Sequence, residues 1–166
     1  MPALSELRSL LNTYTDKHVV VLASGDPLYY GIGRWLVKNI DNSQLNFYPA
    51  VSSIQAACHQ LALSLQDVDV ISLHGRPLEK IRTQLHRNKR LVVLTDQYSQ
   101  PQTLANECIA AGFELSILTV CENLGYKDQR VRSFTAATLA KEKETLFDPL
   151  HVTVIEVVGE GGVLPE

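Results

Sequence analysis

The chain has 166 residues, of which 45% are hydrophobic and 20% charged, so it can bury one core or two small ones. A formal net charge of -3 excludes the clustered basic face that nucleic-acid binding through phosphates requires. The longest apolar runs have the length of a strand, and the first residues lack the basic and apolar parts of a leader. We therefore expect a cytoplasmic protein that binds neither nucleic acid nor membrane.

Short apolar runs alternate with amphipathic segments, which is the pattern of βα units with a largely parallel sheet. This pattern predicts strands at 18–23, 45–48, 69–73, 90–95 and 114–120, and helices near 3–13, 29–39, 53–62, 77–87 and 101–111. The last part differs, with predicted strands at 131–134 and 152–158 around a short helix at 136–141. The alternation in 152–158 suits an antiparallel edge strand, so we expect an α/β fold with a mixed sheet.

The chain divides near residue 49. The elements from 50 to 158 suffice for a complete α/β domain, whereas those before Pro49 are too few to cover both faces of a sheet. We predict a partial N-terminal α/β domain at 1–48, a C-terminal α/β domain at 49–158, and a linker or tail at 159–166. Either the partial domain packs on a partner, which favours a homodimer, or the chain is part of a larger protein.

The cysteines and histidines show no metal-ligand or disulfide spacing. Three widely spaced cysteines lie in apolar or helical stretches and are expected to be buried free thiols in a reducing compartment. Four of the five histidines are scattered, and we predict no metal site. The residues concerned are Cys58, Cys108, Cys121, His18, His59, His86 and His151.

The most informative stretch is Ser24-Gly25-Asp26-Pro27, which follows a predicted buried strand and precedes a predicted helix. Ligands bind at such carboxyl ends of strands, and Gly25 allows close backbone approach. Asp26 is equally well placed as a helix cap, and local physics alone favours that interpretation. Gly31 and Gly33 are not a dinucleotide fingerprint, because they fall inside the predicted helix, where they allow close packing.

Residues 24–33, Ser-Gly-Asp-Pro-Leu-Tyr-Tyr-Gly-Ile-Gly, closely resemble the "GDP" segment of the tetrapyrrole methylases. Residues 49–57 resemble the second cofactor segment of that family, and residues 72–76 the strand and turn that follow in its C5-methylating branch. The resemblance covers about residues 17–158. It implies two α/β domains that hold S-adenosylmethionine between them, and methylation of a precorrin or cobalt-precorrin at C5 in cobalamin biosynthesis.

The resemblance also implies which residues contact the cofactor. Ser24, Gly25 and Asp26 match the first contacting turn, and Tyr29 matches the apolar position beyond it. The other matched positions are Ser52 and Ser53 at a helix start, Thr95 at a strand end, and Leu124 and Gly125 in a later turn. For the two serines a helix N-cap is the alternative role.

His74 and Arg76 end a predicted strand and are candidates for substrate binding. A guanidinium matches carboxylates in a bidentate way, so Arg76 suits the acetate and propionate groups of a corrinoid precursor. The alternatives are a solvated surface arginine and, for His74, a hydrogen bond within the turn.

The resemblance implies chemistry that asks little of side chains. A sulfonium methyl is already activated, so alignment and exclusion of water suffice, and no catalytic residue is predicted. The linker composition of 159–166 suits a fused C15-methylating and decarboxylating partner domain. Two other hypotheses stay open. One is a truncated non-catalytic remnant or assembly domain of the same fold that pairs with another chain. The other is a generic nucleotide-binding α/β domain, which the absence of a P-loop or strand-linked GxGxxG disfavours.

Overall fold

The computed structural model describes residues 3–162 and divides the chain into two compact units, Met1–Ser52 and Ser53–Glu166. The division lies four residues beyond the predicted one at 48/49. Each unit is described by itself. In the predicted tail, the Gly162 N–H donates to the Ala111 carbonyl at 2.8 Å, and residues 163–166 lie outside the described part of the chain.

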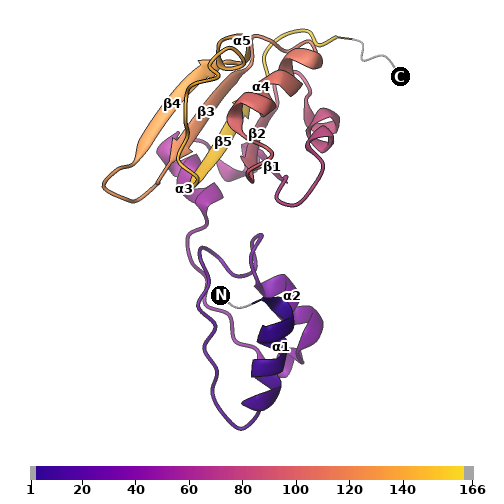
Figure 1. Ribbon diagram of the computed structural model, residues 1–166, viewed down its shortest axis with the longest axis vertical. Helices are drawn as coiled ribbons and strands as arrows, with labels where there is room; N and C mark the ends of the chain where they lie inside the picture. Colours follow the sequence, from indigo (N-terminus) through magenta and orange to yellow (C-terminus); the bar gives the residue numbers. More distant parts are fainter. Residues whose placement is uncertain (1–2, 163–166) are drawn as a thin grey trace. The chain divides into compact units, whose positions relative to one another are not determined.

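Unit 1 consists of helix α1 (Leu4–Thr13), helix α2 (Gly33–Asn39), a 3₁₀ turn η1 (Asn42–Gln44) and extended segments (Figure 1). Its only buried hydrophobic side chains among the described residues are Leu7 and Leu36. The amphipathic pattern correctly predicted α1. The predicted helix at 29–39 begins later, at Gly33, because residues 26–32 form turns instead.

The strand predictions at 18–23 and 45–48 are wrong. Both segments are extended, but neither pairs with another strand within the described residues. Val20 and Leu22 are 80% and 85% exposed, so the apolar run is not buried. A strand forms only where a neighbour completes its hydrogen bonds, and an apolar run cannot encode that neighbour.

Unit 2 is built on one mixed sheet of five strands in the order β1-β2-β5-β3-β4. The strands are β1 (Asp69–Ser72), β2 (Arg90–Leu94), β3 (Ile117–Glu122), β4 (Arg130–Thr135) and β5 (His151–Glu156). β1 and β2 are parallel, and all other pairs are antiparallel. The mixed sheet is confirmed. The edge position predicted for 152–158 is wrong, because β5 pairs on both sides.

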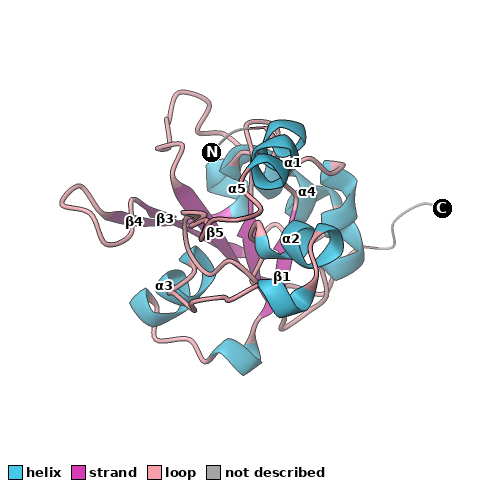
Figure 2. Ribbon diagram, turned by 90° about the horizontal axis from the view of Figure 1, so that it is seen from below, coloured by secondary structure: helices cyan, strands magenta, loops and turns pink. Residues whose placement is uncertain are grey.

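Helices cover both faces of this sheet, with α4 (Pro101–Ala110) and α5 (Ala136–Leu139) on one side and α3 (Ser53–Gln60) on the other (Figure 2). Two short 3₁₀ helices, η2 (Leu65–Asp67) and η3 (Leu78–Gln84), complete the unit, and η3 replaces the α-helix predicted at 77–87. After Arg90, β2 is apolar because Leu91 and Val93 enter the α4 core, whereas Val92 enters the α3 core.

All three cysteines are buried free thiols, as predicted. Cys108 lies in the α4 core and Cys121 in the α3 core. Burial raises the pKa of Cys108 to about 12 and that of Cys121 to about 11, so both are protonated at neutral pH. Their role is therefore packing.

Candidate functional site

The turn at Ser24–Pro27 is held by the Asp26 carboxylate. Asp26 Oδ1 accepts a hydrogen bond from the Leu28 N–H at 2.8 Å, which closes a local turn two residues long. Helix α2 begins only at Gly33, and Ile32, at its N-cap position, makes no side-chain cap bond. The prediction that Asp26 caps this helix is therefore wrong, because the chain turns once more before the helix starts.

The same carboxylate links the turn to the second predicted cofactor segment. Asp26 Oδ2 accepts a hydrogen bond from the Ala50 N–H at 3.4 Å. Gly25 has a φ of +68°, and a Cβ added there would lie 3.5 Å from the Ser52 Cα. Unit 1 thus brings together Ser24, Gly25, Asp26 and Ser52, as two segments side by side. Glycine adopts this left-handed conformation without strain, and its lack of a side chain allows the Ser52 segment to lie close to the turn.

The side chains of these residues differ in exposure. Ser52 is 4% exposed, whereas Ser24 and Tyr29 are exposed. The rings of Tyr29 and Tyr30 have centroids 5.3 Å apart and present an aromatic surface next to the turn. This surface suits the apolar contact that the sequence assigns to Tyr29.

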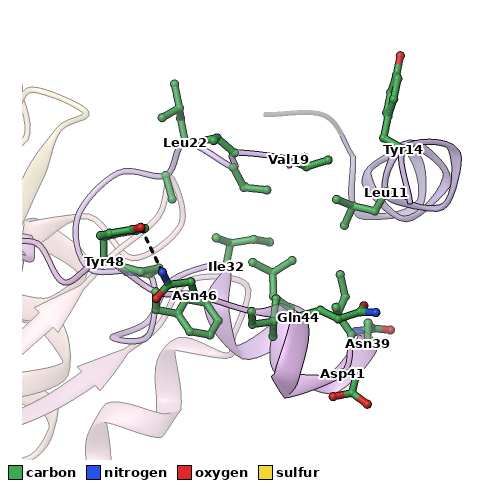
Figure 3. A pocket seen from close by; sticks show the side chains of 18 of the residues that line it. Leu11, Tyr14, Val19, Leu22, Ile32, Asn39, Asp41, Gln44, Asn46 and Tyr48 are labelled. Atoms are coloured by element: carbon green, nitrogen blue, oxygen red, sulfur yellow. Dashed lines mark hydrogen bonds between the residues drawn. The ribbon is translucent and has the colours of Figure 1, made fainter. Parts of the chain in front are cut away.

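A cavity of about 690 Å³ lies within unit 1 and reaches Gly25, Pro27 and Ala50 of the two segments (Figure 3). This volume is in the range of small-molecule sites. Its walls are mainly apolar, and in Figure 3 Ile32 projects toward the segment of Val19, whereas Leu22 and Tyr14 point away. A cavity with apolar walls and a polar turn at its margin can hold a ligand with an apolar body and a polar end.

Unit 2 carries the remaining predicted residues. β1 and β2 are parallel, and β3 and β2 are both antiparallel to β5, so these three strands end at one edge of the sheet. Thr95 follows β2, Leu124 and Gly125 follow β3, and His74 and Arg76 follow β1. The topology therefore gathers these five residues at one edge. Ser53 is the first residue of α3.

His74 and Arg76 lie in a tight turn whose Arg76 N–H donates to the Leu73 carbonyl at 2.9 Å. Gly75, between them, has a φ of +63°. Both side chains are exposed and make no hydrogen bond or ion pair within the described part of the chain. Both remain available to a ligand, and the hydrogen bond that the alternative interpretation assigned to His74 within the turn is not formed.

Asp96 joins this turn to the end of β2, and the sequence analysis did not identify it. Its Oδ2 accepts from the Gly75 N–H at 2.9 Å, and its Oδ1 accepts from Tyr98 N and from Ser99 N and Oγ. The hydrogen bond from Gly75, followed by that from Tyr98, lowers the pKa of Asp96 to about 2. The carboxylate therefore positions the turn that carries His74 and Arg76. Its place directly after a strand was the available signal.

Thr95 contacts a second residue that the sequence analysis left without a role. Thr95 Oγ1 lies 3.0 Å from His151 Nε2, and His151 Nδ1 lies 2.6 Å from the Asp148 carbonyl oxygen. No local signal could have revealed this pair, because the two residues are 56 positions apart.

Leu124 packs against the α3 core, and the neighbouring turn is fixed by side chains. Gly125 has a φ of +85° and donates its N–H to Gln129 Oε1 at 2.8 Å. A Cβ added at Gly125 would meet no atom within 4 Å, so the backbone faces open space. This is the access that a cofactor-lining turn needs.

The described residues contain no group of three histidine, cysteine or acidic side chains that could hold a metal ion. None of the described helices is long and apolar enough to cross a membrane. The roles of the predicted site residues in the two units stay predictions.

Comparison with known proteins gives one family. The model of the tetrapyrrole (corrin/porphyrin) methylases matches residues 4–140. The chain is 41% identical over 149 residues to a precorrin-6Y C(5,15)-methyltransferase [decarboxylating] of Sinorhizobium sp, and 34% identical over 125 residues to a cobalt-precorrin-7 C(5)-methyltransferase of Salmonella typhimurium. These matches cover 89% and 75% of this chain, but only 35% and 61% of the relatives.

Solved structures of similar fold include the precorrin-6Y methylase of Archaeoglobus fulgidus, with a TM-score of 0.70 and 21% identity over 95% of this chain and 73% of that one. A uroporphyrin-III C-methyl transferase of Thermus thermophilus, complexed with S-adenosyl homocysteine, has a TM-score of 0.71 and 20% identity over 92% and 73%. At these identities the likeness shows the fold alone.

Proposed function

We propose, from the premise that this chain belongs to the tetrapyrrole (corrin/porphyrin) methylases, that it binds S-adenosylmethionine and methylates C5 of a precorrin or cobalt-precorrin. The family and the α/β fold predicted from the motifs are both confirmed. The names of the two most informative relatives support the C5 position. Because this chain spans about a third to three fifths of those relatives, the activity of the whole protein is part of the proposal.

The observation that carries the proposal is the pair of hydrogen bonds that the Asp26 carboxylate accepts from the Leu28 and Ala50 N–H groups. One carboxylate holds both the Gly25 turn and the Ala50–Ser52 segment, so the two motifs that the family shares lie together in unit 1. The polar groups of the Gly25 turn and the Ser52 hydroxyl are suited to the polar end of the methyl donor. Tyr29 supplies an apolar contact beside them.

When bound, S-adenosylmethionine would supply a methyl group to a nucleophilic ring carbon, and the substrate would release a proton. Bound S-adenosylmethionine supplies a methyl group that is already activated. The residues of this chain have to hold the donor, orient the acceptor ring and exclude water. Arg76 follows Gly75, whose N–H donates to the Asp96 carboxylate and so fixes the turn. Arg76 is proposed to bind a substrate carboxylate.

Calorimetry with S-adenosylhomocysteine tests the cofactor site of unit 1. We expect the wild-type chain to bind, and Asp26→Ala and Ser52→Ala to lose binding by at least about tenfold, since each removes a hydrogen-bonding group. Asp16→Ala is the matched control, because the exposed Asp16 carboxylate pairs with Lys17 alone among residues 3–162. Equal affinity in Asp26→Ala and Asp16→Ala, or tight binding of a nicotinamide dinucleotide, would overturn the proposal.

Turnover with a precorrin substrate tests the reaction and Arg76. We expect a product heavier by one CH2 unit, because the substrate gains a methyl group and releases a proton. In Arg76→Gln we expect a KM raised by about five- to tenfold with little change in kcat. Arg87→Gln is the control, since Arg87 only pairs with the exposed Glu160. A KM unchanged in Arg76→Gln would leave this arginine as a solvated surface residue.

A second candidate is an assembly domain that pairs with another chain without catalysis. The segments at 18–23 and 45–48 favour this candidate. They lie largely exposed and pair with no strand among the described residues, and extended apolar segments associate readily. It predicts a dimer by light scattering and no binding of S-adenosylhomocysteine. A homodimer, or contact with a C15-methylating and decarboxylating domain such as the name of the Sinorhizobium relative describes, is also compatible with the methyltransferase proposal.

A further inference from the structure

The two hydrogen bonds of His151 determine which of its ring nitrogens carries the proton. His151 Nδ1 lies 2.6 Å from the carbonyl oxygen of Asp148, and a carbonyl oxygen can only accept. Nδ1 must therefore be the protonated nitrogen. In the neutral imidazole, Nε2 is then an acceptor, so the Thr95 hydroxyl at 3.0 Å has to donate its hydrogen to His151.

The pair is built into the sheet. His151 is the first residue of β5, and Thr95 directly follows β2, the antiparallel neighbour of β5. In the antiparallel pair of β2 and β5, Val93 lies opposite Thr153. Two residues further along each strand, the same register places Thr95 opposite His151. The geometry therefore depends on strand pairing and not on a mobile loop.

The charged groups around His151 come from three elements. Glu122, on β3, lies opposite His151 in the strand register. Its carboxylate accepts hydrogen bonds from Arg130 and Arg132 of β4. The carboxylate of Asp148 accepts from the Leu150 N–H. The Phe147 ring lies 6.3 Å from the imidazole, with Arg132 on that ring. None of these groups makes a direct hydrogen bond to the imidazole within the described residues.

We propose that His151, with its imidazole neutral, sets the hydrogen-bonding polarity of Thr95, so that this hydroxyl offers only acceptor lone pairs to a bound ligand. Its one hydrogen is committed to His151, and the ligand group that it binds must be an N–H or O–H donor. This inference rests on the proposed cofactor role of Thr95. S-adenosylmethionine carries such donors in its amino groups and ribose hydroxyls. His151 is then a positioning residue for the cofactor.

Protonation of His151 reverses the polarity. Nε2 gains a hydrogen and donates to Thr95 Oγ1, so the Thr95 hydrogen turns outward and faces the donor of the ligand. One attractive contact becomes a repulsive one. Cofactor binding should therefore weaken when His151 is protonated.

The tautomer is tested first, without any ligand. In the full chain labelled with nitrogen-15, two-bond correlations between ring protons and nitrogens identify which nitrogen of His151 is protonated at pH 8, with His151→Gln used for assignment. We expect the proton on Nδ1. A proton on Nε2 would overturn the inference.

The effect on binding is tested by calorimetry with S-adenosylhomocysteine from pH 8 to pH 5.5. We expect the wild type to lose about five- to tenfold in affinity over this range, in addition to any loss seen in the variants. His151→Gln retains an amide that can accept from Thr95 but does not titrate, and Thr95→Val removes the hydroxyl. Both variants should remove the pH-dependent part, whereas Thr95→Ser should keep it.

The outcomes separate this inference from the proposed function. No binding by the wild type at any pH would overturn the proposed function, and with it the ligand contact of Thr95. Binding by the wild type with the same pH profile in His151→Gln would leave the proposed function intact and overturn the role of His151. If His151 had a purely structural role, His151→Gln would lower the affinity by the same factor at every pH, and this result would also overturn the inference.

Discussion

At the scale of single residues, Glu122 shows how much one buried charge depends on its partners. The side chain is 1% exposed, and its oxygens accept from Arg130, Arg132 and the Asp148 N–H at 2.8–3.0 Å. Burial by itself would raise the pKa of Glu122. The hydrogen bonds from Arg130, Asp148 and Arg132 outweigh it and lower the pKa from 4.5 to about 2.

We expect Glu122→Gln to lower the free energy of unfolding by about 2–3 kcal/mol at pH 7, because two arginines then lose their carboxylate. A carboxyl group with a lowered folded-state pKa stabilises the fold above its unfolded pKa, and this contribution is lost on acidification. The difference between wild type and variant should thus shrink from pH 4.5 to about 2. Urea unfolding at several pH values measures it. A difference that stays constant from pH 7 to 2 would contradict the role of the charge.

Thr153 gives the opposite prediction. It is fully buried in β5, and its Oγ1 has no hydrogen-bond partner among the described residues. Thr153→Val replaces the hydroxyl by a methyl group of the same shape and removes the cost of burying it. We expect about 1 kcal/mol of added stability in urea unfolding. Thr119→Val is the matched control, since the Thr119 hydroxyl is hydrogen-bonded to Ser133 and its removal should destabilise.

At the scale of elements, prediction from the sequence succeeded for most elements of unit 2, which holds both hydrophobic clusters, and for one helix of unit 1. β1, β2 and β5, and helices α1, α3 and α4, lie within a few residues of their predicted positions. β3 is Ile117–Glu122, against a prediction of 114–120, because Gly112 to Ser116 form turns before it. Boundaries depend on turns that hydrophobic periodicity does not describe.

The same limit explains the candidate site. The motifs indicated Ser24–Asp26 and Ser52, and unit 1 places these segments together. The roles of Asp96 and His151 were missed, because each acts through partners that are distant in sequence. Residue type and spacing predict which segments matter, whereas pairing across a sheet decides which side chains meet.

Hydrogen exchange should separate the extended segments of unit 1 from the strands of unit 2. Residues 18–23 and 45–48 are extended without a pairing strand among the described residues, so their amides should exchange within seconds to minutes. The amides of β2 and β5, which pair on both sides, should be protected by orders of magnitude more. The full chain is labelled, and mass spectrometry of the peptides digested from it measures the exchange of each segment. Strong protection at 18–23 would show that another segment or chain pairs there.

At the scale of the whole molecule, the two units differ in how much core each contains. Unit 2 holds both hydrophobic clusters, one on each face of its sheet, and nearly all fully buried side chains of the described residues. Unit 1 buries only Leu7 and Leu36 among its hydrophobic residues. A unit with so small a core has little to offset the conformational entropy of its chain.

This imbalance predicts that unit 2 folds without unit 1. A fragment of residues 53–166 should show a cooperative urea transition, with a midpoint close to that of the main transition of the full chain. Residues 1–52 alone should show no cooperative transition, since two buried leucines cannot hold its helices. Far-UV circular dichroism follows both. If the fragment 53–166 were unfolded while the full chain folds, the stability of unit 2 would have to come from residues 1–52, and its two clusters would not be a sufficient core.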